Sequence, residues 1–364
     1  MDKEFLEQGL NHNRRKFLSR LSLGVGSVAL GSLLIPDLFS GKKEAEESLM
    51  RALPHFAPKA KRIIYLFQNG APSQLETFDY KPQLIKSSVQ ELPESIRMGQ
   101  RLTGMTAGQD SFPLVGSYFE FNQYGQSRAW ISSLFPHLSA VVDDLCIVKS
   151  MHTEAINHDP ALTFFQTGAQ VGNRPSMGSW LSYGLGSENE NLPAFCVLLS
   201  RGKGNGQGVY SKLWSSGFLD ARHQGVQFSN SEDPVLYLSD AEGISKDQRR
   251  RMLDQLAAMN DLSYQEFNDP QITTKVQQYE MAFRMQSSVP ELTAVSQEPD
   301  STYQLYGDQA RKPGSFAYTA LLARRLVERG VRFVQVYLNN WDHHANTAGR
   351  MPSQCKDIDQ ACYG

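Results

Sequence analysis

The 364-residue sequence has little cysteine, no excess of charge of either sign and no long apolar run. None of its four cysteines belongs to a Cys-x-x-Cys pair, which excludes a disulfide-dense scaffold and argues against a thiolate metal site. The 36 basic and 38 acidic side chains give a formal charge of −2, which argues against the basic surface of a nucleic-acid-binding protein. The length suffices for one large α/β domain or two ordinary domains with a sizeable core.

The first 40 residues have the pattern of an export signal. Arg14-Arg15 and Phe17-Leu18 precede residues 21–35, an uncharged run rich in Gly, Ser, Ala and Leu that is too short for a comfortable membrane span. The arginine pair resembles the twin-arginine signal of proteins exported in folded form. We expect 1–40 to be a signal peptide recognised by the twin-arginine translocase, either cleaved or kept as an anchor, and 41–61 to be a linker. The protein is then periplasmic or in the cell envelope; the alternative is a cytosolic amphipathic helix.

From residue 62 onward, apolar runs alternate with helical patterns. The apolar runs predict buried strands at 62–67, 145–148, 194–199 and 331–338. Helical spacing predicts helices at 129–142, 160–166, 176–185, 245–262, 269–287 and 316–330, with a further helix at 353–364. Residues 201–243, rich in Gly, Ser and Asp, predict an insertion. The alternation predicts an α/β fold whose largely parallel sheet is covered on both faces, with functional groups at the carboxyl ends of the strands.

Asp342, His343 and His344 follow the last expected strand. Carboxylate oxygen and imidazole nitrogen suit Zn, Mn or Fe, and three such groups together are costly to bury unless they are paired or bound to a metal. Side chains two positions apart in an extended loop point to the same side, so Asp342 and His344 are the favoured pair. The alternative is a polar loop anchored by its tryptophan.

A second polar set includes His152, Asn157 and His158, ahead of the helix expected at 160–166. The amino end of a helix offers backbone N–H groups and positive potential to an anion. His158 is the candidate catalytic residue, with a ligand, acid–base or nucleophilic role left open. The competing interpretation is that Asn157 or Asp159 acts only as a helix cap.

A third polar set spans residues 68–79, directly after the first expected strand. Asn69 and Ser73 are candidates for lining the site, although Ser73 is also suited to capping a turn. Asp79 precedes Tyr80-Lys81-Pro82, so we expect it to organise that turn rather than take part in chemistry.

Several longer motifs carry a family resemblance. They are Asn69-Gly-Ala-Pro-Ser-Gln-Leu-Glu-Thr-Phe-Asp-Tyr-Lys-Pro82, Asn157-His-Asp-Pro160 with Thr167-Gly168, Gly178-Ser-Trp-Leu-Ser-Tyr-Gly-Leu-Gly186, Tyr279-Glu-Met-Ala-Phe-Arg-Met-Gln286, and Leu322-Ala-Arg-Arg-Leu-Val-Glu-Arg-Gly330 leading into Trp341-Asp-His-His344. With the twin-arginine start, they resemble the DUF1501 proteins, which are exported, sulfatase-like members of the alkaline phosphatase superfamily. The resemblance covers nearly the whole chain.

The resemblance implies a three-layer α/β sandwich with a two-metal site at the carboxyl edge of its sheet, where a phosphate or sulfate ester is clamped. One or two divalent metals, drawn from Zn, Mn, Ca and Fe, are implied, with Asp342 and His343 or His344 at a ligand position. Gln68 and Asn69 stand where relatives place an aspartate. His158 replaces the sulfatase nucleophile, so no formylglycine forms there.

The expected function is therefore that of an exported metal-dependent hydrolase acting on an anionic ester or a polysaccharide. The alternative is a non-catalytic binding protein of the cell envelope that reuses the fold. The resemblance also implies a later Gly-Glu-Phe-Gly-Arg segment and an Asp-His pair that carry the other metal's ligands. The 364 residues contain neither, so we expect a C-terminally truncated chain that is inactive by itself.

Overall fold

The computed structural model describes residues 56, 59–99, 104, 106–200, 208–228 and 243–364. The expected signal peptide, most of the expected linker and part of the expected insertion lie outside these residues. Residues Arg62–Gly364 form a compact unit. Among the described helices, none combines the length and the apolar character needed to cross a membrane.

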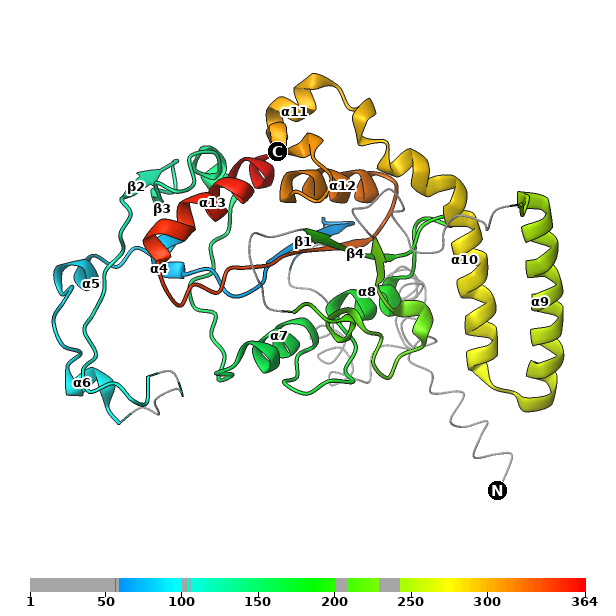
Figure 1. Ribbon diagram of the computed structural model, residues 1–364, viewed down its shortest axis with the longest axis horizontal. Coiled ribbons are helices and arrows are strands. Elements are labelled where there is room, and N and C mark those ends of the chain that lie inside the picture. The colour runs from blue at the N-terminus through cyan, green and yellow to red at the C-terminus, as the bar shows by residue number, and fades with distance from the viewer. Residues whose placement is uncertain (1–55, 57–58, 100–103, 105, 201–207, 229–242) are drawn as a thin grey trace, which may run out of the picture. The chain divides into compact units, whose positions relative to one another are not determined.

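The central sheet of the described residues has four strands in the order β1-β6-β4-β5, and all of its pairings are parallel (Figure 1). The strands are β1 (Ile63–Gln68), β4 (Phe195–Ser200), β5 (Val226–Phe228) and β6 (Phe333–Leu338). In the register, Leu338 pairs with both Gln68 and Ser200, so three strands end together at one edge. The predicted α/β class with a parallel sheet is confirmed.

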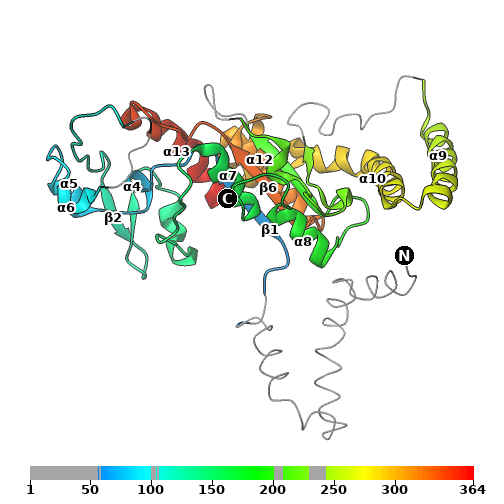
Figure 2. The same cartoon turned by 90° about the horizontal axis from the view of Figure 1, so that it is seen from below.

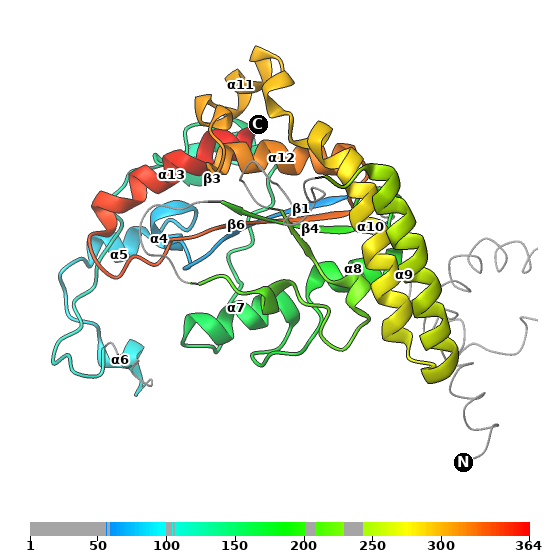
Figure 3. The same ribbon diagram turned by 45° about the vertical axis from the view of Figure 1, so that its right-hand side comes forward.

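Helices lie on both faces of this sheet (Figures 1 and 3). One face carries α7 (His158–Thr167) and α8 (Met177–Leu185), and the other carries α12 (Phe316–Glu328). The last helix, α13 (Thr347–Tyr363), packs against α12. The loop from β6 to α13 therefore begins at the carboxyl edge of the sheet.

Strand β6 is buried at every residue, because it lies between two strands and under helices on both faces. Val334 and Val336 belong to the apolar cluster formed with α12. Phe333 and Tyr337 belong to a second cluster on the opposite face. A strand covered on both faces reads as a continuous apolar run rather than as an alternating one, which is why 331–338 could be recognised from the sequence.

The helix expected at 129–142 is wrong. Ala129–Ser132 is instead strand β3, antiparallel to β2 (Phe121–Tyr124), and a 3₁₀ segment follows at Leu138–Asp144. Pro136 disfavours the helical conformation of the residue before it, so one continuous helix through this region is unfavourable. Of the apolar residues whose helical spacing misled the prediction, Leu138 is buried, whereas Trp130, Leu134 and Val141 are partly buried.

The structure also bears on the strand expected at 145–148 and on the insertion expected at 201–243. Residues 145–148 form no strand, and Leu145 and Val148 are 40% and 58% exposed, because an apolar run becomes a strand only where a partner pairs with it. The segment 201–243, which we expect to be an insertion, contributes β5, which pairs in parallel with β4.

Two long helices, α9 (Lys246–Phe267) and α10 (Pro270–Thr293), form a hairpin (Figure 2). They confirm the helices expected at 245–262 and 269–287, and each continues for five or six residues beyond its expected end. A capping box formed by Ser245 and Gln248 begins α9. The remaining short elements are α4 (Gln74–Thr77), α5 (Pro82–Lys86), α6 (Glu94–Arg97), η3 (Ser211–Trp214), η4 (Ala221–His223), η5 (Val295–Gln297), α11 (Asp300–Tyr306) and η6 (Asp308–Arg311).

A largely buried ion pair fastens the end of α10 to α12. Glu298 accepts hydrogen bonds from Arg324 Nη2 at 2.7 Å and from Arg325 Nη1. Arg325 also donates to the carbonyl oxygens of Glu291 and Leu292. Burial by itself would raise the pKa of Glu298, but the hydrogen bonds and charges of the two arginines outweigh it and lower that pKa below its ordinary value.

Glu298→Gln should therefore destabilise the protein by about 3 kcal/mol at neutral pH, because it leaves the buried Arg325 without its anionic partner. The stabilisation requires ionised Glu298, so it is complete above the unfolded pKa of about 4.3 and is lost as the pH falls through the lower folded value. Urea unfolding at several pH values measures it. The gap between wild type and variant should narrow below pH ~4.3; a constant gap contradicts the prediction. Glu291→Gln, at an exposed ion pair with Arg329, should cost under about 1 kcal/mol.

Candidate metal centre

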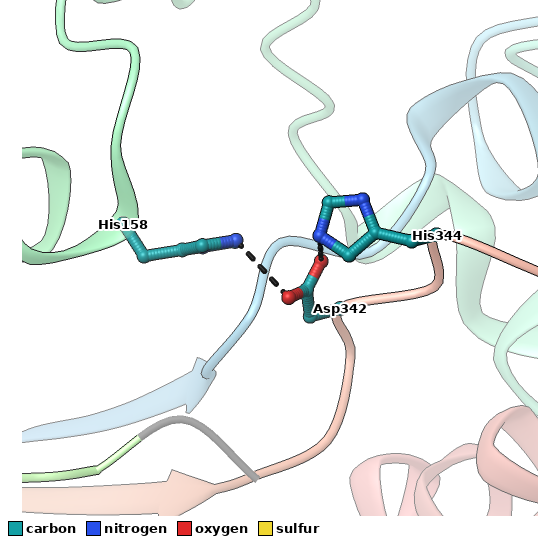
Figure 4. Close-up of side chains that lie close together, drawn as sticks. All are labelled: His158, Asp342 and His344. Carbon is teal, nitrogen blue, oxygen red and sulfur yellow. Dashed lines mark ion pairs between the residues drawn. The ribbon is translucent and has the colours of Figure 1, made fainter. Parts of the chain in front are cut away.

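Three donor side chains meet just beyond the carboxyl edge of the sheet (Figure 4). His158 is the first residue of α7, whereas Asp342 and His344 lie in the loop between β6 and α13. The Asp342 carboxylate lies between the two imidazoles. Its Oδ2 is 3.3 Å from His158 Nε2, and its Oδ1 is 2.8 Å from His344 Nε2. One side chain thus joins two segments that are distant in the sequence.

The spacing of these donors fits a single metal ion. One ligand atom from each of the three residues lies within 4.8 Å of the others. Nitrogen and oxygen ligands sit about 2.0–2.2 Å from Zn, which places neighbouring ligand atoms about 3 Å apart. The side chains of His158, Asp342 and His344 are 30%, 21% and 53% exposed, so the group is open to solvent and to a ligand. Two imidazoles and one carboxylate form a donor set that suits Zn, Mn or Fe.

The loop that carries Asp342 is held by the residues that follow β1. The Asn69 N–H donates to the Leu338 carbonyl at 2.7 Å, and the Asn69 carbonyl accepts from the Trp341 N–H at 3.0 Å. The Asn69 side chain donates to Asn339 Oδ1 at 3.0 Å. Asn69 is fully buried, so this predicted site-lining residue holds the loop in place.

Gly70 lies against the same loop at very short range. Its φ is +107°, a conformation that side-chain-bearing residues rarely adopt. A Cβ atom added there would lie 2.5 Å from the backbone nitrogen of Asp342 and 2.9 Å from the carbonyl carbon of Trp341. The Asn-Gly pair after the strand indicated a turn in the sequence, but not that the turn would pack against residue 342.

Helix α7 is positioned by a buried polar contact with β6. Gln335 in β6 donates to Gln166 of α7 at 2.6 Å and to the Tyr337 hydroxyl at 2.7 Å. All three side chains are buried. A buried amide must keep its hydrogen bonds, so this contact fixes α7 on the sheet and His158 at its edge.

The interpretation that Asn157 or Asp159 acts only as a helix cap does not agree with the contacts of their side chains. Asn157 occupies the N-cap position of α7, but its exposed side chain makes no capping hydrogen bond. Asp159 instead forms an ion pair with Lys212 at 2.5 Å. The first-turn N–H groups of α7 are therefore not capped by Asn157.

The other candidate residues are not among the grouped donors. The His343 ring is 6.3 Å from the Trp341 ring, and burial lowers the pKa of its imidazole. His152 is exposed and is not among the grouped donors. Ser73 precedes α4 without a side-chain capping bond, and its carbonyl accepts from the Thr77 hydroxyl.

The two carboxylates after β1 have partners of their own. Asp79 pairs with Lys81 at 3.0 Å and with Lys149 at 4.0 Å. Glu76 is buried and accepts from the Ser117 hydroxyl and the Tyr118 N–H. Neither belongs to the grouped donors.

Comparison with known proteins identifies the family. The family model described as "Protein of unknown function (DUF1501)" matches residues 60–364, which is well over half of the chain. No curated protein and no solved structure matches the chain. The match covers every strand of the sheet and all three grouped donors. The chain therefore belongs to the DUF1501 family.

Proposed function

We propose that this protein is an exported, metal-dependent hydrolase of the sulfatase and phosphatase type, with His158, Asp342 and His344 as metal ligands. The observation that carries the proposal is the convergence of these donors at the carboxyl edge of a parallel sheet. That edge is where α/β proteins hold their ligands. Helices on both faces of the sheet support the alkaline-phosphatase-like three-layer sandwich that the sequence resemblance implies.

A divalent cation at this site would supply Lewis-acid stabilisation of the charge that develops on a phosphoryl or sulfuryl oxygen. Asp342 would provide the anionic ligand, and His158 and His344 would bind through neutral imidazole nitrogens. The amino end of α7 would add backbone N–H groups and positive potential for the anionic ester. In this arrangement His158 is a ligand, and its role as an acid, base or nucleophile is the competing assignment.

The donor chemistry favours Zn, Mn or Fe over Ca, because Ca takes six to eight oxygen ligands and imidazole is not one of them. An anionic ester of a small molecule or of a polysaccharide is the proposed substrate. Export by the twin-arginine route and a location in the periplasm or cell envelope belong to the same proposal, which rests there on residues 1–40 of the sequence.

A second candidate is a non-catalytic envelope protein that binds an anionic ligand at the same edge. The observation that favours it is the end of β1, where Gln68 and Asn69 replace the aspartate expected of a two-metal hydrolase. Asn69 is buried in contacts with the β6 loop. Among the described residues, only His158, Asp342 and His344 form a group of three donors close enough together to hold a metal ion.

The test is to load the full-length protein with Zn, Mn or Fe, measure the bound metal, and assay the hydrolysis of aryl phosphate and aryl sulfate esters. The hydrolase proposal expects about one or two bound ions per molecule and ester hydrolysis that disappears with a chelator. Bound metal without hydrolysis of either ester would favour the binding protein. A protein that binds none of these metals would contradict the hydrolase proposal.

A further inference from the structure

Helix α9 presents an exposed apolar stripe along one face. Met252, Leu256 and Met259 follow helical spacing of four and three residues and are 49%, 36% and 67% exposed. Leu253, on the side that packs toward α10, is 7% exposed. Large apolar side chains in a continuous exposed row are typical of a surface that another molecule covers.

The hairpin is held rigid beneath this stripe. Arg250 forms a two-pronged ion pair with Glu280 of α10, with nitrogen–oxygen distances of 2.5 and 2.9 Å. Arg250 also bonds to Asp254 one turn further along α9. Figure 3 shows the two helices side by side along their length. The stripe is therefore a preformed surface.

The charges of α9 are distributed unevenly along its axis. Residues 246–254 carry four basic and two acidic side chains, whereas 260–267 carry two acidic side chains and no basic one. Leu256 and Met259 of the stripe lie in the uncharged middle of the helix. A second α9 in the antiparallel direction would bring each basic end beside an acidic end, whereas a parallel partner would bring like charges together.

We propose that a second copy of this chain docks on α9 with the two helices antiparallel about a two-fold axis. An axis midway between Leu256 and Met259 places Leu256 of each copy opposite Met259 of the other. The same symmetry places Arg249 opposite Glu266, at the two ends of the stripe. The apolar residues supply the contact area, and the charged ends set the direction.

A pair of 22-residue helices is about 33 Å long and buries an area at the low end of specific interfaces. We therefore expect a dissociation constant on the order of micromolar. Sedimentation velocity of the full chain between roughly 1 and 100 μM, a range chosen to span that constant, should show monomers becoming dimers. High salt should weaken the dimer, since the paired ends are exposed.

Charge reversal tests the geometry directly. Arg249→Glu or Glu266→Arg alone should raise the dissociation constant at least about tenfold, because each places like charges together at both ends. The double variant restores opposite charges in both copies and should recover dimerisation. Leu256→Glu should abolish it, while Val89→Glu, at an apolar residue 85% exposed elsewhere, should not change it.

Three results would overturn the proposal. They are a monomer at every concentration, a dimer that withstands Leu256→Glu, and a double variant as weak as the single ones. A monomer in which Met259 resists oxidation would instead show that another part of the same chain covers the stripe. Circular dichroism of each variant confirms that α9 remains folded, so lost association cannot be ascribed to lost helix.

Discussion

Asp342→Ala should lower the affinity of the protein for the proposed divalent cation by more than about 100-fold. Substitutions that only disturb the partners of metal ligands already cost about 10- to 100-fold, and this one would remove the proposed anionic ligand itself. The change also removes the carboxylate that lies between His158 and His344. Competition with a chromophoric chelator measures the affinity for wild type and variant side by side.

Asp79→Ala is the matched control for that experiment. Asp79 is also a carboxylate near the carboxyl edge of the sheet, and its side chain is 15% exposed compared with 21% for Asp342. It pairs with lysines rather than with imidazoles. Its loss should leave metal affinity within about twofold, since it removes no ligand. Equal affinities for wild type and Asp342→Ala would show that the site has been wrongly assigned.

Gly70→Ala should reduce the free energy of unfolding by about 3 kcal/mol. Adopting a positive φ costs a residue with a side chain about 1–2 kcal/mol, and the new methyl group overpacks the backbone of residues 341 and 342 by about as much again. That backbone cannot retreat cheaply, because the Trp341 N–H bonds to the Asn69 carbonyl. Urea unfolding followed by tryptophan fluorescence gives the value.

Gly168→Ala separates the two contributions. Gly168 ends α7 with a φ of +75°, and nothing lies within 4 Å of the position of an added Cβ. This variant should show the conformational cost alone, about 1 kcal/mol. If Gly70→Ala costs no more than Gly168→Ala, the close approach to Asp342 does not constrain the loop. If it costs more, it should also weaken metal binding by displacing Asp342.

The parts of the fold that the sequence predicted correctly are those determined by local pattern. Apart from Gln335 and Ser200, β6 and β4 are apolar because helices cover both their faces, and α12 shows a clear apolar side and a basic residue, Arg325, in its last turn. The run at 145–148 has similar composition but forms no strand. The difference is whether a partner strand is available, and that depends on β6, which is far away in the sequence.

The candidate site also has a part that local sequence reveals and a part that it does not. The spacing of Asp342 and His344 could be read from three adjacent residues, and His158 was a candidate because it precedes a helix. Their meeting depends on Gln335 holding α7 against β6, and on the buried contacts of Asn69. Both contacts join residues more than a hundred positions apart, so no local pattern reveals them.

The pairing of β1 with β6 also has a consequence for the time course of folding. Asn69 and Asn339, which meet at the ends of these strands, are 270 positions apart. At about 5–20 residues per second, the ribosome adds the second roughly 15–50 s after the first. Until then the apolar residues of β1 have no partner strand in the described sheet, and such an edge invites pairing with other chains. A chaperone that shields residues 63–67 during synthesis would therefore protect the nascent chain until β6 enters between β1 and β4.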